Sequence, residues 1–219
     1  MAQRLKLQRA PVTQPRFTRV FGPTCECDKA TAQLSVRLRR ADRLGAAIVN
    51  VDGEPVRTLA TGLERPRGRT RLTWDGRDDA GRVVPEGRYR LRLRLERADR
   101  TIVVPTPVRV DTTAPRVELL SLKPRAISPD GDGRADRARY TYRSSEFGYP
   151  VVYVNGEYTA RGRHWPAGIG KAQWRAGAGD GTFLPAGTYQ TYLQVVDVAG
   201  NRSEPTETVA VRIRFTELP

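Results

Sequence analysis

Apolar and polar residues alternate along several short stretches of the chain. After Gly87 every second side chain is apolar, from Tyr89 to Leu95, and the side chains between them are arginines. A period of two is typical of a β-strand with one buried face. No stretch has the period of a helix, so the pattern predicts an all-β protein. The predicted strands cover residues 33–40, 46–51, 55–60, 69–74, 87–97, 101–110, 116–122, 138–143, 151–155, 187–196 and 206–215.

Landmark residues between these strands recur at a fixed interval. Trp74, Pro85, Gly87 and Tyr89 are each matched by the same residue type one hundred positions later. Such self-similarity indicates two copies of one structural unit in tandem. Asp-Gly and Pro-Xaa-Gly sequences beside the matched residues supply turns before a strand. A tyrosine two residues after such a glycine occupies the position of the tyrosine corner of immunoglobulin-like sandwiches, and we expect both tryptophans in a core.

Several motifs resemble one known family. The first copy has Asp52-Gly53, Trp74-Asp75-Gly76 and Gly87-Arg88-Tyr89, and the second opens with Ile-Ser-Pro-Asp-Gly-Asp-Gly-Arg-Ala-Asp at 127–136. These motifs are similar to those of the immunoglobulin-like domain named after the flagellar hook-capping protein FlgD. The resemblance covers nearly all of the chain after the N-terminal segment, although Gln-Trp-Arg-Ala at 173–176 replaces the Trp-Asp-Gly turn. It implies two tandem immunoglobulin-like, or fibronectin-III-like, antiparallel β-sandwiches.

The repeat and the motifs together predict the domain organisation. Residues 1–22 are basic, contain prolines and lack an apolar run, so we expect a flexible segment in which neither a signal peptide nor a membrane span is visible. The first sandwich is expected at 23–110 and the second, of the FlgD type, at 116–219. The polar, proline-terminated stretch 111–115 between them is the expected linker.

The chain is strongly basic, with 38 lysines and arginines against 24 acidic residues and a net charge of +14. Only Lys6, Lys29, Lys123 and Lys171 are lysines, so the remaining basic residues are arginines. This preference is interpreted as a composition bias. Binding of anionic polymers such as cell-wall polymer, acidic polysaccharide or nucleic acid stays open as an alternative.

The most chemically suggestive stretch contains Asp130, Asp132 and Asp136, separated by glycines. Carboxylates at this spacing can wrap calcium, which takes six or more oxygen ligands, and Asp111 and Asp197 could complete such a site. The alternative is an Asp-Gly turn whose carboxylates accept hydrogen bonds from backbone amides. No other cofactor is expected.

The two cysteines, Cys25 and Cys27, are separated by one residue. They are too few for a structural zinc site, which needs four ligands. We expect two free thiols in a loop, with an intermolecular disulfide or a reactive thiol as alternatives.

The sequence offers no constellation for catalysis. His164 is the only histidine, and no glycine-rich phosphate loop opens a helix. We therefore expect a non-enzymatic structural or interaction module of a bacterial extracytoplasmic or cell-surface protein, acting as a spacer or an adhesive domain. Loops around Trp165 and residues 149–153 are expected to contact a protein or a cell-envelope polymer rather than nucleic acid. The module is expected to belong to a larger multidomain protein; flagellar hook scaffolding is the alternative function.

Overall fold

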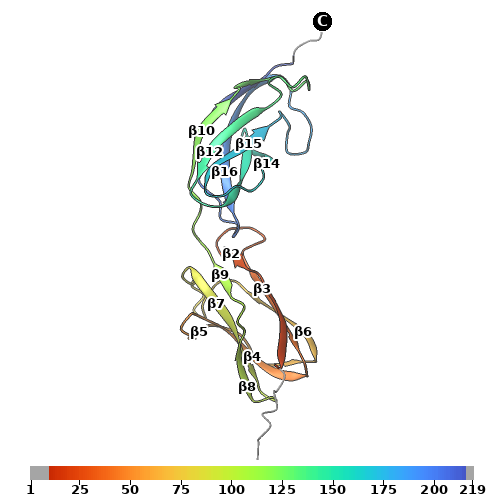
Figure 1. Ribbon diagram of the computed structural model, residues 1–219, viewed down its shortest axis with the longest axis vertical. Helices are drawn as coiled ribbons and strands as arrows, with labels where there is room; N and C mark the ends of the chain where they lie inside the picture. The colour runs from red at the N-terminus through yellow and green to blue at the C-terminus, as the bar shows by residue number, and fades with distance from the viewer. Residues whose placement is uncertain (1–9, 216–219) are drawn as a thin grey trace, which may run out of the picture. The chain divides into compact units, whose positions relative to one another are not determined.

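The computed structural model describes residues 10–215, and within that range every regular element is a β-strand (Figure 1). The all-β prediction is therefore confirmed. The chain divides into two compact units, residues 1–112 and 113–219, and each has its own hydrophobic core. Among the described residues no helix has the length and apolar character needed to cross a membrane.

The first unit is a sandwich of two sheets. One sheet has the strand order β1-β3-β6, and the other has the order β2-β9-β7-β4-β5 with β8 also paired to β7. All pairs are antiparallel except β2 with β9. The strands are β1 (Val12–Phe17), β2 (Val20–Phe21), β3 (Ala32–Leu38), β4 (Asp42–Val49), β5 (Pro55–Arg65), β6 (Gly68–Trp74), β7 (Gly87–Leu95), β8 (Arg100–Val103) and β9 (Val108–Val110).

The second unit repeats this topology, except that β8 has no counterpart among its described strands. Its sheets have the orders β10-β12-β15 and β11-β17-β16-β13-β14, and β11 pairs with β17 in parallel as β2 does with β9. The predicted duplication is therefore present in the strand order as well as in the landmarks. The strands are β10 (Val117–Lys123), β11 (Ala126–Ile127), β12 (Ala138–Ser144), β13 (Gly148–Val154), β14 (Glu157–Arg161), β15 (Gly168–Trp174), β16 (Gly187–Asp197) and β17 (Val209–Ile213).

The two tryptophans occupy equivalent core positions. Trp74 is 1% exposed and Trp174 is 2% exposed, each at the end of the third strand of its smaller sheet. Each indole Nε1 donates a hydrogen bond to a carbonyl three residues later, at 3.0 Å in the first unit and 2.8 Å in the second. Each indole ring also contacts a tyrosine ring edge to face, Tyr89 in the first unit and Tyr189 in the second. The landmark residues thus organise both cores in the same way.

The N-terminal prediction needs correction. We expected residues 1–22 to be a flexible segment, but β1 pairs with β3 and β2 pairs with β9. Phe21 is fully buried in the first core, which explains why this part of the chain is held in the sandwich. Residues 1–9 lie outside the described range.

Several strand predictions also change. The predicted strand at 101–110 is divided into β8 and β9, because Pro105 and Pro107 have no N–H to donate to a ladder. Strands β11, β14 and β15 were not predicted. The strand predicted at 151–155 corresponds to β13, which begins earlier, so residues 149–153, also expected as a contact loop, lie within a strand. Asp52-Gly53, a dipeptide typical of hairpin turns, connects β4 to β5.

Candidate functional site

The structure brings Asp130, Asp132 and Asp136 together in the loop between β11 and β12. Each offers a carboxylate oxygen, and these oxygens all lie within 4.8 Å of one another. The first two side chains are exposed and the third is half-buried. The spacing that suggested a calcium loop therefore does place three oxygen ligands around one point.

Backbone amides already use these carboxylates. Asp136 accepts hydrogen bonds from the amides of Gly131 and Gly133 at 3.0 and 3.1 Å. Asp130 accepts a bond from the hydroxyl of Ser128 at 2.7 Å, which is the main reason that its pKa lies below the ordinary value. Each carboxylate oxygen carries a second lone pair, so a capping role and a ligand role are chemically compatible.

Asp111 and Asp197, considered as further ligands, are engaged elsewhere. Asp111 forms an ion pair with Arg109 at 2.7 Å within the first unit. Asp197 accepts bonds from the amides of Gly200 and Asn201 and from the Asn201 side chain, which closes the turn after β16. Neither carboxylate belongs to the group formed by the three loop aspartates.

Cys25 and Cys27 form an intramolecular disulfide in the loop between β2 and β3. The expectation of two free thiols was therefore wrong. Glu26 between them has a φ of 46°, a left-handed conformation that turns the chain back on itself. Their Cα atoms consequently lie 5.2 Å apart, within the range that a disulfide spans.

An open hollow of about 810 Å³ lies at one end of the first unit, beside the β3–β4 and β7–β8 turns. Arginines dominate its lining, and its one acidic residue is Asp42. This carboxylate is 5% exposed and accepts hydrogen bonds from the amides of Arg43, Arg97 and Ala98 at 2.8, 2.9 and 3.2 Å. Asp42 therefore acts as the structural acceptor that ties the two turns together.

The outer face of the larger sheet of the second unit is unusually apolar. Val152 and Val154 of β13 point into the core, so Val151 and Tyr153 point outward. Yet Val151 is 3% exposed, Tyr153 is 8% exposed and Val196 on the neighbouring strand is 5% exposed. These side chains form a separate apolar cluster with the half-buried rings of Tyr149 and Tyr192.

Rings and guanidinium groups cover this cluster. Tyr153 stacks on Tyr192 with ring centroids 4.9 Å apart and meets Tyr158 edge to face. Arg161 places its guanidinium 3.7 Å from the centre of the Tyr149 ring. Arg202 lies 5.9 Å from the Tyr153 ring and donates to its hydroxyl.

His164 also contacts these aromatic rings. Its ring stacks on Phe147 with centroids 5.4 Å apart and meets Tyr149 edge to face at 5.1 Å. The only histidine of the chain is thus a member of an aromatic surface. We name this surface the aromatic–arginine face and define it by Phe147, Tyr149, Tyr153, Tyr158, Arg161, His164, Tyr192 and Arg202.

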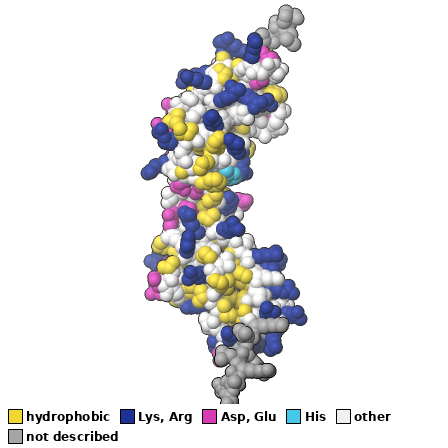
Figure 2. All heavy atoms as spheres, viewed as in Figure 1, with side chains coloured by type: hydrophobic (Ala, Val, Ile, Leu, Met, Phe, Trp, Pro, Cys, Tyr) yellow, Lys and Arg dark blue, Asp and Glu magenta, His cyan; other side chains and the backbone are white. Residues whose placement is uncertain are grey.

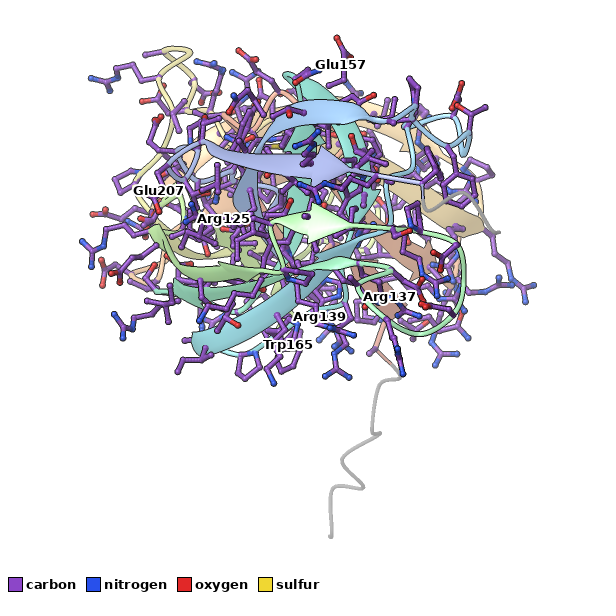
Figure 3. All side chains as sticks on the ribbon, turned by 90° about the horizontal axis from the view of Figure 1, so that it is seen from above. Arg125, Arg137, Arg139, Glu157, Trp165 and Glu207 are labelled. Carbon is purple, nitrogen blue, oxygen red and sulfur yellow. A yellow bond between two sulfur atoms is a disulfide. The ribbon has the colours of Figure 1, made fainter. Side chains whose placement is uncertain are left out.

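The predicted contact residues are only partly brought together. Tyr149 and Tyr153 belong to the aromatic–arginine face, but Trp165 points toward the other sheet and donates from Nε1 to the carbonyl of Lys171 at 3.0 Å. In Figure 3 Trp165 lies on the same side of the second unit as Arg137 and Arg139, with Glu157 on the opposite side. Sequence reasoning missed Tyr192 and Arg202, although Tyr192 interrupts a polar outward row and could have been noticed.

Comparison with known proteins agrees with this architecture. Residues 22–99 match the family model of the FlgD Ig-like domain. The match falls in the first unit, which carries the Trp74-Asp75-Gly76 turn, and it confirms the family resemblance there. The FlgD type of the second unit stays a prediction. No curated protein matches the chain by sequence.

Three solved structures illustrate the similarity in fold. The fibronectin(III)-like modules of Clostridium thermocellum CbhA are 16% identical, with a TM-score of 0.47 and coverage of 95% of this chain and 96% of theirs. The BSP domain of a biofilm-associated protein is 15% identical, with a TM-score of 0.31 and coverage of 95% and 30%. Domains 5–6 of the S-layer protein SbsC are 12% identical, with a TM-score of 0.27 and coverage of 94% and 98%.

Proposed function

We propose that the chain is a non-catalytic Ig-like interaction module of a bacterial extracytoplasmic or cell-surface protein. The observation that carries the proposal is the aromatic–arginine face, because outward positions of a sheet that faces water are normally polar. Arginine, tyrosine and tryptophan are also the residues most enriched where proteins bind partners. The filled cores of both sandwiches leave the outer faces and loops as the surfaces available for binding.

The disulfide supports an extracytoplasmic location of the chain. Disulfides persist in oxidising environments such as the periplasm and the cell exterior and are rare in the cytosol. The bond between Cys25 and Cys27 therefore favours an extracytoplasmic location. The FlgD Ig-like match over 22–99 supports an add-on module within a larger multidomain protein.

Two measurements test this proposal. Thiol titration of the protein isolated from its host should find both cysteines oxidised, and the chain should sediment with cell-envelope fragments at about 150 mM salt. Reduced cysteines in the host, or a chain that stays in the supernatant with every envelope preparation, would contradict it. A spacer role without binding would give oxidised cysteines and no sedimentation.

Calcium binding at Asp130, Asp132 and Asp136 is a second proposal. The mutual distance of their oxygens supports it, because calcium takes carboxylate oxygens from flexible, glycine-containing loops. The bound ion would stiffen the loop between β11 and β12.

Assembly into the flagellar hook is a further candidate, supported only by the FlgD Ig-like match. Its test is whether the chain is found in purified hook structures.

A further inference from the structure

The aromatic–arginine face is specific to the second unit. The register of β13 on β16 corresponds to that of β4 on β7, because the buried residues Leu193 and Leu93 occupy matching positions. The core is thus conserved between the copies while the outward positions differ. Two outward cross-strand pairs lie beside these leucines in each unit. Where the first unit pairs Ala47 with Arg92, the second pairs Tyr153 with Tyr192. Where the first unit pairs Gly45 with Arg94, the second pairs Val151 with Gln194.

The aromatic–arginine face carries two arginines, Arg161 and Arg202. Both are exposed. The guanidinium of Arg161 lies over the Tyr149 ring, and that of Arg202 donates to the hydroxyl of Tyr153, so neighbouring rings restrict both groups. No carboxylate in the described part of the chain forms an ion pair with either of them. A guanidinium that is stacked on a ring keeps N–H donors on its edge, in the planar arrangement that matches a carboxylate.

We propose that the aromatic–arginine face binds an acidic polysaccharide, meaning a chain of sugar rings that carry carboxylates. The carboxylates would accept paired hydrogen bonds from Arg161 and Arg202. The exposed ring of Tyr158, which is 51% accessible, and that of Phe147, which is 48% accessible, would contact the apolar C–H faces of the sugars. The proposal rests on the proposed function as an interaction module and names its ligand class.

Other partners fit the face less well. A protein interface needs an apolar core to bury, but Val151, Tyr153 and Val196 are already covered by their neighbours. Strand addition at the edge of β14 is obstructed by the loop between β15 and β16, because a Cβ placed on Gly179 of this loop would lie 2.5 Å from the carbonyl oxygen of Tyr158.

A second copy and a nucleic acid are also disfavoured. Each chain carries a net charge of +14, and basic side chains are spread over both units in Figure 2, so two such faces would repel. Single-stranded nucleic acid stacks its bases on free ring faces. Here Tyr153 and Tyr192 stack on one another, and Arg161 covers Tyr149, so only Tyr158 and Phe147 offer exposed rings for successive bases.

Titration calorimetry of the full chain with polygalacturonate tests the proposal. Methyl-esterified polygalacturonate keeps the sugar rings and removes the charge, whereas poly-L-glutamate and oligothymidylate keep negative charge without the sugar acids. We expect polygalacturonate to bind and each of the other three to bind at least about tenfold more weakly, because charge and ring contacts are both needed. Equal binding of the esterified polymer, of poly-L-glutamate or of oligothymidylate would overturn the proposal, as would no binding of polygalacturonate.

Variants locate the site. Arg161→Gln with Arg202→Gln should weaken polygalacturonate binding by about tenfold or more, the loss expected when two charge-assisted contacts disappear. Tyr158→Ala should weaken it without changing the residual affinity for poly-L-glutamate. The matched control is Arg137→Gln with Arg139→Gln, which removes the same charge at the start of β12, a strand of the other sheet of the unit. An equal loss in this control would overturn the assignment of the face, and thermal unfolding verifies that each variant is folded.

The outcome separates this inference from the proposed function. If envelope fragments still sediment the chain while polygalacturonate does not bind, the interaction module stands and the acidic polysaccharide is wrong. If neither binds and the cysteines are reduced in the host, both proposals fail.

Discussion

The hydroxyl of Tyr89 donates a hydrogen bond to the carbonyl oxygen of Pro85 at 2.8 Å, which ties the start of β7 to the turn before it. Tyr189 makes the same bond to Pro185 at 2.9 Å in the second unit. Both copies therefore contain the tyrosine corner that the repeated Pro-Xaa-Gly-Xaa-Tyr pattern predicts. The two bonds differ mainly in burial, since Tyr89 is 5% exposed and Tyr189 is half-buried.

Tyr89→Phe should lower the free energy of unfolding of the first unit by about 1 kcal/mol, the net value of a typical hydrogen bond. Tyr189→Phe should cost the second unit less, because water can replace the lost donor at the more exposed site. Calorimetric unfolding of the full chain measures both effects. A Tyr89→Phe variant as stable as the parent would show that this bond does not contribute.

Tyr142→Phe should have the opposite effect. Its hydroxyl is buried and, among the residues that the structure describes, has no hydrogen-bond partner. Removing the group removes a desolvation cost of about 1–3 kcal/mol, so the second unit should be unchanged or more stable. A loss as large as that of Tyr89→Phe would indicate a bond that the structure does not contain.

Tyr142 should also make the stability of the second unit depend on pH in the alkaline range. Burial raises the pKa of Tyr142 to about 12, above the value of about 10 in an unfolded chain. The folded chain keeps the phenol neutral at pH values where the unfolded chain ionises it, so the free energy of unfolding falls as the pH rises from about 10 toward about 12. Unfolding measured across this range should therefore show a smaller alkaline loss in Tyr142→Phe than in the parent.

Gly170→Ala should destabilise the second unit. Gly170 lies opposite Tyr142 on the neighbouring strand, and a Cβ there would lie 2.3 Å from Cζ of the tyrosine ring. Forcing this ring aside should cost about 1–3 kcal/mol. Gly177→Ala is the matched control, because its nearest neighbour would be 3.7 Å away. Denaturant unfolding compares the two, and equal stabilities would contradict the close contact.

Acid should loosen the Asp-Gly turns. Backbone bonding from Arg82 holds the pKa of Asp78 below its usual value, and bonding from Thr182 does the same for Asp180. A lowered pKa contributes stability that is present above the unfolded value and is lost as the pH falls through the folded value. Carboxyl NMR titration should place both transitions below pH 3.8, and transitions at or above it would contradict these bonds.

Calcium should bind the loop of Asp130, Asp132 and Asp136 with a dissociation constant of about 0.1–1 mM, as in extracellular modules. Asp132→Asn should weaken binding because it removes a formal charge. Asp180→Asn, in another exposed Asp-Gly turn, is the control and should leave binding unchanged. A flat calorimetric trace at millimolar calcium would leave the three carboxylates with their capping role alone.

The sequence by itself determined what depends on local patterns. The alternation along β7 predicts a strand with one buried face, and the matched tryptophans and tyrosines predict two copies of one sandwich. The three aspartates could also be predicted to lie together, because only five residues lie between the first and the last. Short-range geometry sets all of these features.

Only the tertiary structure decided what depends on pairing between distant strands. The parallel pairing of β2 with β9 places Phe21 in the core, and no local pattern marks it. Likewise, Tyr153 meets Tyr192 because β13 and β16 pair in one register, and a shift by one residue would send Tyr192 to the opposite face of the sheet. Register is a long-range property, so the aromatic–arginine face could not be assembled from the sequence alone.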